Sequence, residues 1–410
     1  MTVTRTGAPT ITGSRLGWAA LAVYLATRAV STLFILAAGR LQVPYERWTG
    51  PGPVTFLDMS VVWDGSWYRT IAEDGYPAEL PLSDDGVVRQ NQWAFYPLFP
   101  MLSRGLMVLT GMDFRLAGTL VALVTGCGAA VLMVRLFARY APPAVALAAM
   151  GVWAVQPAAP TLQIAYTESL AVLVLVGFFL ALVQRNWLLV GVLAVVLGVT
   201  RPIALPLALV VGVVVLLEVR RWWTARPRPT MRTLAAPVAA LLVTGFSGLI
   251  WPTIVTIGTG RSDGYAETMA SWRAGHEIVP FRPWIDNTAY LLFRETGHPR
   301  LYAALAVTAL ALLLILAAAG PWARRLPLEL RLWIVAYPAY LAAVLDVGTS
   351  LIRYAIPLFP IALILIGGGA RRIPRWWPVL ATVLAVLLIV AQHQWTTQLL
   401  VLDPPSDFPP

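Results

Sequence analysis

The residues best suited to chemistry lie in segment 63–68, with the sequence WDGSWY, which follows the first long apolar run of the chain. The aspartate of this segment, Asp64, is flanked by tryptophans, which favour the interface between a bilayer and water. An acidic side chain held there can take a proton from a hydroxyl group of a membrane-anchored substrate. Asp64 is therefore the candidate general base, and the nearby acids Asp58, Glu73 and Asp74 are the alternatives.

A short helix must position this aspartate. Trp63, Trp67 and Ile71 recur every four residues, a spacing that predicts a helix, and Gly75 supplies a C-terminal stop. The structural interpretation of Asp64 is an N-cap of this helix, since aspartate is among the best capping residues. The position of Asp64 alone favours neither the cap nor the base.

Arg28 lies in the middle of the first apolar run, which extends over about residues 16–38. With a rise of about 1.5 Å per residue, it would be on the order of 15 Å from either membrane surface, too deep to reach water easily. A charge at that depth faces the protein interior or a wet cavity. We therefore expect Arg28 either to form a structural ion pair or to bind an anionic substrate.

Other polar residues fall between apolar runs on the same predicted side of the membrane. They are Tyr166 and Glu168, then Arg201 between two short runs, then Arg353 and Tyr354. Each alone could be an ordinary solvated loop residue, but short runs that meet at Arg201 suggest a depression with this arginine at its floor. A base together with cationic side chains that bind a phosphate is what glycosyl transfer from a lipid phosphate donor requires.

The composition places these residues in an integral membrane protein. Of the 410 residues, 58% are hydrophobic and 12% are charged, whereas soluble domains carry about 25% charged residues. Apolar runs are spaced along the whole chain, which predicts a single membrane-embedded domain over residues 1–410. The first run is too long for the core of a cleaved signal peptide, so we expect an uncleaved span.

About eleven apolar runs can cross a bilayer as helices, so the expected fold is all-α and polytopic. They extend over about residues 16–38, 116–136, 144–156, 164–183, 187–199, 203–217, 233–257, 301–319, 332–345, 354–368 and 377–391.

Basic and acidic residues are unevenly distributed between the two sides of the membrane in this predicted topology. The connections on the side of the N-terminus hold 16 of the 30 arginines, among them Arg5, Arg226 and Arg228, but only two acids, Glu218 and Glu329. The other 18 acids fall on the opposite side. Basic residues mark cytoplasmic loops. We therefore expect a multi-pass protein of the cell membrane with a cytoplasmic N-terminus and an extracytoplasmic active site.

Two predicted external segments, about residues 40–94 and 258–300, are long and rich in Trp, Tyr and Pro. Loops of this length are usually functional or disordered, and their aromatic content argues against disorder. The stretch around Asp64 and the stretch 95–110 are expected to form interfacial helices that lie on the outer leaflet.

The chain offers little for a metal ion or a nucleic acid. Its only cysteine, Cys127, lies within an apolar run, and His276, His298 and His393 are far apart, so we expect no metal site built from these residues. The formal net charge of +10 comes from arginines, without any lysine, between apolar runs, which is the pattern of cytoplasmic loops. No cofactor is expected to be required. A divalent metal is compatible with the chemistry, although arginines can supply the countercharge.

In its ordered set of motifs the chain resembles the PIG-V family of mannosyltransferases, which includes the second mannosyltransferase of GPI-anchor synthesis and has bacterial members. The resemblance extends over most of the chain and rests on segments 63–68 (WDGSWY), 94–100 (AFYPLFP), 166–170 (YTESL), 200–202 (TRP) and 353–354 (RY). It is completed by Ile71, Ala72, Gly75, Tyr76 and Pro357. Such families belong to the GT-C class, multi-span glycosyltransferases that use polyprenyl- or dolichyl-phosphate sugars at an external active site.

The resemblance implies an inverting transferase that moves mannose from a polyprenyl-phosphate mannose, and it marks Trp63 and Asp64 as the functional positions. The arginine-only, Ala/Val/Leu-rich composition suggests a high-GC bacterium. The expected acceptor is therefore a cell-envelope lipoglycan, glycolipid or glycoprotein, since GPI synthesis is eukaryotic.

In this interpretation Asp64 is the base, and Arg201 and Arg353 bind the leaving phosphate, with Arg28 as a weaker candidate. The remaining substrate-binding candidates are Trp63, Trp67, Tyr68, Tyr166, Glu168 and Tyr354. The alternative function is a lipid or glycolipid transporter or flippase, in which the intramembrane charges would line a translocation path. Transporters often contain internal repeats, and the sequence has none that we recognise.

Overall fold

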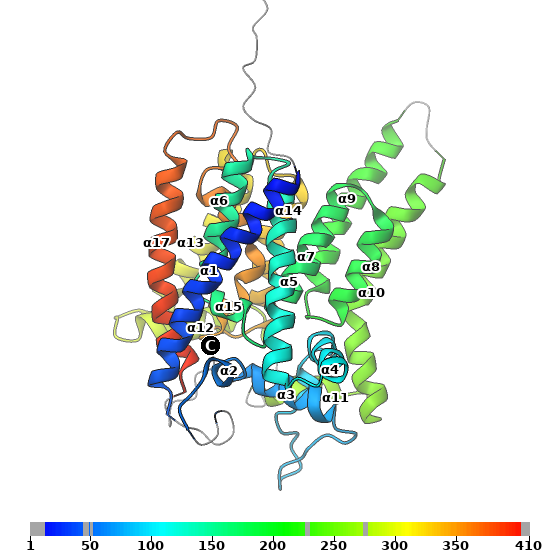
Figure 1. Ribbon diagram of the computed structural model, residues 1–410. Coiled ribbons are helices and arrows are strands. Elements are labelled where there is room, and N and C mark those ends of the chain that lie inside the picture. The colour runs from blue at the N-terminus through cyan, green and yellow to red at the C-terminus, as the bar shows by residue number, and fades with distance from the viewer. Residues whose placement is uncertain (1–12, 44–48, 50–51, 226–229, 274–277, 403–410) are drawn as a thin grey trace, which may run out of the picture.

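Helices account for almost all of the regular structure of the protein (Figure 1). The computed structural model describes residues 13–43, 49, 52–225, 230–273 and 278–402. Within these ranges the strand-type pairing is limited to one isolated bridge between Leu82 and Val88. The predicted all-α class is therefore confirmed. Four residues used in the sequence analysis, Arg5, Arg226, Arg228 and His276, lie outside the described residues.

Among the described residues, five helices are long and apolar enough to cross a membrane. They are α1 (Gly13–Leu41), α5 (Phe114–Phe137), α10 (Arg232–Thr259), α13 (Pro299–Ala319) and α17 (Trp377–Trp395). A helix pairs its backbone N–H and C=O groups within itself, which hydrocarbon requires because it offers no other partners. α13 also exposes a row of leucines, among them Leu305, Leu312 and Leu316, as expected of a surface that faces lipid. The protein is therefore a helical protein of the membrane-embedded type.

Further helices complete the helical body, and most of them are shorter. They are α6 (Pro143–Ala154), α7 (Glu168–Val183), α8 (Trp187–Gly198), α9 (Ala204–Thr224) and α14 (Leu328–Val344). α7 is buried along most of its length and packs against α5 and α8, so it forms the centre of the body (Figure 1). The predicted number of about eleven crossings stays a prediction, because several of these helices are shorter than a bilayer is thick.

The expected span over residues 354–368 is not one helix. The structure divides this region into α15 (Leu351–Tyr354), a 3-10 turn (Ile356–Leu358) and α16 (Pro360–Leu365). Pro357 and Pro360 explain the break, because proline lacks the N–H group that a continuous helix needs and clashes with the preceding turn. The break leaves α15 as a short element that can carry a side chain into the interior.

The helices of the two long connections gather at one end of the molecule, the lower end in Figure 1. They are α2 (Phe56–Met59), α3 (Asp64–Asp74), a 3-10 turn (Gln92–Ala94), α4 (Leu98–Thr110), α11 (Gly264–Ser271) and α12 (Arg282–Phe293). The two connections contact each other, since the hydroxyls of Tyr96 and Tyr265 share a hydrogen bond of 3.2 Å. Nδ2 of Asn91 also donates to Oγ1 of Thr268 at 3.2 Å.

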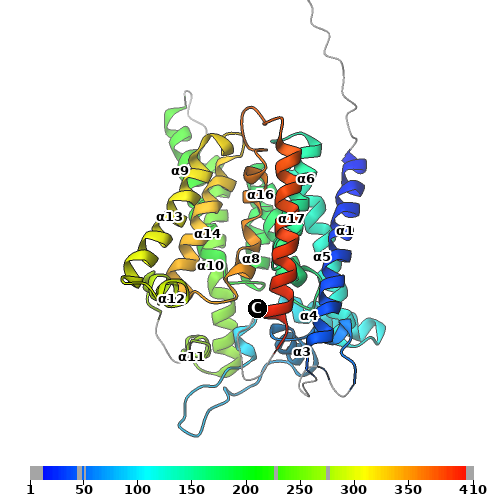
Figure 2. The same ribbon diagram turned by 90° about the vertical axis from the view of Figure 1, so that its left-hand side faces the viewer.

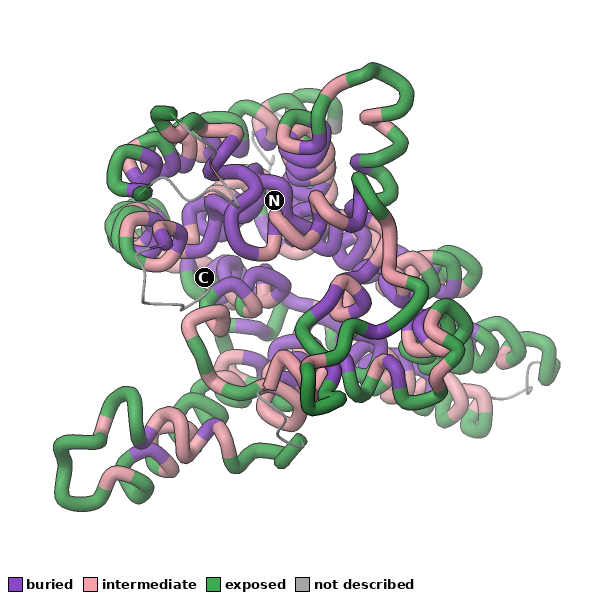
Figure 3. The backbone as a smooth tube through the Cα atoms, turned by 90° about the horizontal axis from the view of Figure 1, so that it is seen from below, coloured by how far each residue is buried: buried purple, intermediate pink, exposed green. Residues whose placement is uncertain are grey.

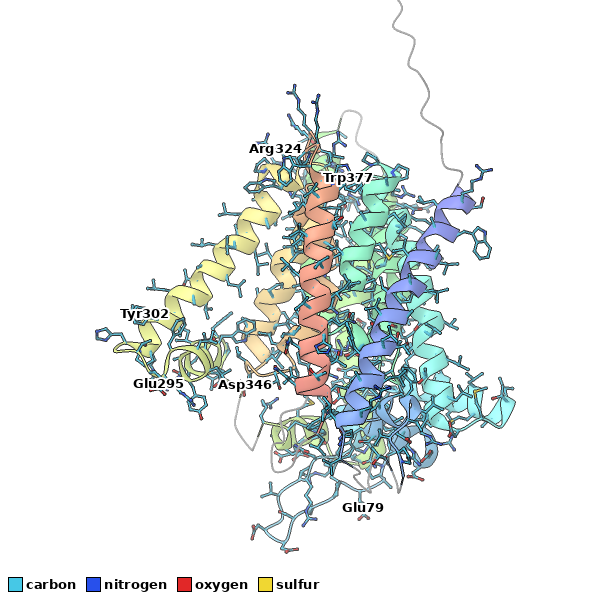
Figure 4. The ribbon with its side chains drawn as sticks, turned by 60° about the vertical axis from the view of Figure 1, so that its left-hand side comes forward. Glu79, Glu295, Tyr302, Arg324, Asp346 and Trp377 are labelled. Carbon is cyan, nitrogen blue, oxygen red and sulfur yellow. The ribbon has the colours of Figure 1, made fainter. Side chains whose placement is uncertain are left out.

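The two ends of the body differ in charge. Arg324 and Trp377 lie at one end, and Glu79, Glu295 and Asp346 lie toward the other (Figure 4). α1 begins at the arginine-bearing end, and α17 ends at the acidic one (Figure 2). Seen from the acidic end, buried residues occupy the middle of the body and exposed residues surround them (Figure 3). This distribution of charge between the two ends agrees with the predicted orientation. Which end is cytoplasmic and which is external stays a prediction.

Candidate active site

Trp63 fixes the point at which α3 begins. Its backbone has a φ of 55° and a ψ of −120°, and a positive φ costs a non-glycine residue about 1–3 kcal/mol. The indole is buried, and its Nε1 donates a hydrogen bond to the carbonyl oxygen of Leu400 at 3.0 Å. These contacts hold the turn in place, so that the next residue, Asp64, starts the helix in a fixed position.

Asp64 is the first residue of α3 and not its N-cap. The N-cap position belongs to Trp63, which makes no side-chain capping bond. Oδ2 of Asp64 instead accepts a hydrogen bond from Nη1 of Arg353. A carboxylate in the first turn is also stabilised by the helix dipole. The capping interpretation of Asp64 is therefore wrong, whereas the predicted helix that stops at Gly75 is confirmed.

Arg353, on α15, joins the partly exposed Asp64 to a buried carboxylate, that of Glu168. The Arg353 side chain is 3% exposed, and its Nε lies 3.7 Å from Oε1 of Glu168. Glu168 is the first residue of α7, and the same Oε1 accepts a hydrogen bond of 2.6 Å from Nη2 of Arg201. Arg201 lies in the connection between α8 and α9. Asp64, Glu168, Arg201 and Arg353 thus form one network, which we name the buried charge cluster.

The buried charge cluster has a formal charge of zero, since two carboxylates face two guanidinium groups. Removing an ion from water costs several kcal/mol, and only pairing of this kind offsets that cost. The side chain of Asp64 is 20% exposed, compared with 11% for Arg201 and 1% for Glu168. Asp64 is therefore the carboxylate of the cluster that a substrate hydroxyl can reach.

Two tyrosines hold the guanidinium groups in place. Cζ of Arg353 lies 5.3 Å from the ring centre of Tyr166 and 5.4 Å from that of Tyr354. Cζ of Arg201 lies 5.6 Å from the ring centre of Tyr354. At these distances the rings attract the cations electrostatically. The hydroxyl of Tyr166 donates to the carbonyl oxygen of Val62 at 3.0 Å, which joins the approach to α7 to the turn before Asp64.

Aromatic rings adjoin Asp64 along α3. The ring centre of Trp67 lies 5.8 Å from that of Phe95 in a stacked arrangement and 5.5 Å from that of Trp272 in an edge-on one. Tyr68 meets Phe95 edge-on at 5.3 Å. Burial raises the pKa of the Tyr68 hydroxyl well above its ordinary value, and the negative charges of Glu168 and Asp64 raise this pKa further. Tyr68 therefore stays neutral beside the carboxylates and can act as a hydrogen-bond donor.

Arg28 is the predicted site residue that lies elsewhere. Its guanidinium donates to the backbone carbonyl oxygens of Ala154 and Ala159 and stands 4.9 Å from the ring centre of Tyr24. Ala154 is the last residue of α6, where carbonyl groups carry partial negative charge. Arg28 thus ties α1 to the end of α6. Its hydrogen-bond acceptors are these two carbonyls and the hydroxyl of Thr27, so within the described part of the chain neither the expected ion pair nor a place in the buried charge cluster is observed.

The alternative bases near Asp64 lie apart from the buried charge cluster. Asp58 forms a capping box with Thr55 and an ion pair of 2.9 Å with Arg115. Glu73 pairs with Arg69 at 3.0 Å on the outer face of α3, and Asp74 is exposed at the end of that helix.

Sequence reasoning missed two contributors to the site. Phe95 belongs to a motif that was recognised, but its contact with Trp67 was not predicted. Trp272 comes from the second long connection, whose richness in aromatic residues was the available signal. Among the described residues, no group of three or more His, Cys, Asp or Glu side chains is arranged to hold a metal ion. Whether the chemistry needs a metal stays a prediction.

The chain matches no family model, and no curated protein is similar to it.

Proposed function

We propose that the protein is a mannosyltransferase that transfers mannose from a polyprenyl-phosphate mannose to a hydroxyl group of a cell-envelope acceptor. The observation that carries the proposal is the partial exposure of Asp64, which pairs with the buried Arg353, while the partly buried Arg201 is joined to Arg353 through Glu168. An accessible carboxylate suits a base, and adjacent guanidinium groups suit the phosphate of a lipid-linked donor.

In the proposed reaction, Asp64 takes the proton of the acceptor hydroxyl while the hydroxyl oxygen attacks C1 of the mannose. The bond between C1 and the phosphate oxygen breaks, and polyprenyl phosphate leaves with the electron pair. Attack from the face opposite the leaving group inverts the anomeric centre. The leaving phosphate is already a weak base, so the step needs no general acid.

Arg353 and Arg201 would stabilise the charge on the departing phosphate. Each guanidinium has five N–H donors, and the Asp64 and Glu168 contacts engage only a part of them. Glu168, at 1% exposure, is a positioning residue in this mechanism, because it orients both arginines from below the surface. Trp63, Tyr68, Tyr166 and Tyr354 keep Asp64 and the arginines in place, and Trp67, packed with Phe95 and Trp272, would be part of the aromatic surface that contacts the substrate.

We further propose that the protein is a bacterial member of the PIG-V family within the GT-C class. The motifs at 63–68, 166–170 and 353–354 contribute residues to the same cluster, which supports treating them as one site. In this proposal the protein crosses the cell membrane about eleven times, its N-terminus is cytoplasmic and the cluster faces outward. The acceptor is a lipid-linked glycan, a glycolipid or a glycoprotein.

The competing function, a lipid or glycolipid flippase, would use the same buried charges to move an anionic head group across the bilayer. The test is to incubate the purified protein in proteoliposomes with radiolabelled polyprenyl-phosphate mannose and a membrane lipid extract. A transferase produces a new labelled lipid or protein. A flippase only changes the leaflet that holds the unaltered donor.

The variant Asp64→Asn decides the role of the base. General-base catalysis is worth about 10²–10⁴-fold, so transfer should fall by at least the lower bound. Asp84→Asn, in an exposed loop, is the matched control and should keep wild-type activity. Robust transfer by a well-expressed Asp64→Asn protein would contradict the mechanism and leave Glu168 as the remaining carboxylate of the cluster.

A further inference from the structure

A groove of about 870 Å³ lies beside Arg324 (Figure 4), at the end of the body opposite the one that holds α3 and Asp64 (Figure 1). Leu313 and Leu316 of α13 line one wall, Leu380 of α17 lines the other, and Ile361 and Leu365 of α16 form the floor. α13 packs against α14, whereas α17 packs against α6, so the two walls of the groove belong to different helix pairs, and the short helix α16 contributes to the lining between them. The groove is therefore apolar and opens toward the region that hydrocarbon would occupy.

Arginines close the groove at the arginine-bearing end of the body. Arg324 comes from the connection after α13, and Arg371 and Arg372 come from the connection before α17. All three side chains are exposed, and none belongs to an ion pair among the described residues. Two tryptophans, Trp322 and Trp376, flank them, as is typical of the level of lipid head groups.

Arg324, Arg371 and Arg372 form a rim at this end of the groove. The two connections that carry them are hydrogen-bonded to each other. The backbone N–H of Arg325 donates to the carbonyl oxygen of Gly369 at 2.9 Å, and Nη2 of Arg325 donates to that of Arg371 at 2.7 Å. Gly369 permits this approach, since a Cβ atom there would lie 2.3 Å from the carbonyl oxygen of Trp322. The three rim arginines are thus carried by one bonded unit and are not on independent loops.

We propose that this groove binds an anionic glycerophospholipid, with its phosphate at Arg324, Arg371 and Arg372 and its acyl chains between α13 and α17. Charge complementarity selects this occupant. The rim presents three unpaired cations, and basic pockets between membrane helices bind anionic head groups. A zwitterionic phospholipid brings its own cation beside the phosphate and so supplies no net negative charge to the three arginines. The inference does not depend on the proposed transferase activity, since the groove and the buried charge cluster lie at opposite ends of the body.

The test measures binding of phosphatidylglycerol to the purified full-length protein by native mass spectrometry, with phosphatidylcholine as the neutral comparison. Arg371→Gln combined with Arg372→Gln should weaken phosphatidylglycerol binding about 10- to 30-fold. Each arginine near an anionic head group strengthens lipid binding by roughly 3- to 5-fold, and the double variant removes two of them. Binding of phosphatidylcholine should be weak and unchanged.

Two further variants distinguish binding of the lipid in this groove from a general attraction of the lipid to positive charge. Arg135→Gln combined with Arg139→Gln removes the same charge from exposed positions at the end of α5, outside the groove, and should leave binding intact. Leu365→Trp fills the floor at an exposed position while keeping every arginine, and it should abolish binding.

Several results would overturn the proposal. These are equal binding of the two lipids, wild-type binding by the Arg371 and Arg372 variant, and an equal loss in the Arg135 and Arg139 control. Retained binding in Leu365→Trp would place the lipid elsewhere. Preferential binding of polyprenyl phosphate over phosphatidylglycerol would assign the groove to a different occupant.

Discussion

At the scale of single residues, the pairing of Arg201 with Glu168 makes a specific demand on the arginine. Nη2 of Arg201 lies 2.6 Å from Oε1 of Glu168, and the guanidinium also stands over Tyr354. A planar cation with several donors can serve a carboxylate, a ring and an incoming phosphate at once, whereas an ammonium group cannot. The same argument applies to Arg353, which contacts Asp64, Glu168 and Tyr354.

We therefore expect Arg201→Lys to lose part of the transferase activity and Arg201→Ala to lose considerably more, with the same order at Arg353. Lysine keeps a positive charge near Glu168 but lacks the planar guanidinium group with its several N–H donors. The alanine leaves Glu168 buried with one partner fewer, which destabilises a protein by about 3–5 kcal/mol when a buried pair is broken. Turnover and unfolding temperature in detergent are measured together. Alanine variants with wild-type turnover would exclude both arginines from the reaction.

Single residues also mark what the sequence can and cannot predict. The helix after Asp64 follows from a four-residue spacing, which is a local property. The contact between Arg353 and Asp64 joins positions 289 residues apart and depends on how the body packs, so no local pattern contains it. Arg28 was predicted to be buried and is 3% exposed, but depth alone could not tell a carbonyl partner from a substrate.

At the scale of helices, the site depends on how closely α8 approaches α10, because α8 leads directly to Arg201. Gly198, the last residue of α8, permits this approach. A Cβ atom there would lie 2.4 Å from the backbone carbonyl oxygen of Ser247 on α10. Such a contact with backbone cannot be relieved by turning a side chain.

The break at Pro357 and Pro360 is a second feature at the scale of helices. The two prolines were a signal in the sequence that could have predicted this break.

We expect Gly198→Ala to destabilise the protein by about 1–3 kcal/mol, the usual cost of overpacking, and to displace Arg201. Gly245→Ala on α10 is the matched control, since nothing lies within 4 Å of the added Cβ atom. The control should be neutral or slightly stabilising, because alanine favours the helical conformation. Thermal unfolding in detergent measures both effects. Equal unfolding temperatures for the two variants would show that α8 and α10 can separate without cost.

At the scale of the whole molecule, Arg324 lies at one end of the body and Glu79, Glu295 and Asp346 lie toward the other (Figure 4), which is also the end that holds α3 and Asp64 (Figure 1). If that end faces outward, a lipid-linked donor and its acceptor meet Asp64 outside the cytoplasm. The sequence predicts this orientation from arginine counts alone. Its assignment to one side of a real membrane needs a chemical test.

Single cysteines at Ser83 and Asp263, introduced into a Cys127→Ala background, should react with a membrane-impermeant thiol reagent in intact cells. A cysteine at Thr224, in the exposed last turn of α9, should react only after the cells are broken. The extent of labelling is measured on the purified protein. Labelling at Thr224 in intact cells would reverse the orientation and place Asp64 on the cytoplasmic side.

The bond between Trp63 and Leu400 also bears on the order in which the protein is made. The indole near the start of the chain has its acceptor 337 residues later, and Gln42 likewise exchanges hydrogen bonds with the backbone of Leu402. The five long apolar helices named above all precede Val401 and Leu402 in the chain, and α17 ends only five residues before Leu400. The turn that presents Asp64 can therefore close only after Leu400 has been synthesised, and a chain that stops before this residue lacks the bond that holds the turn.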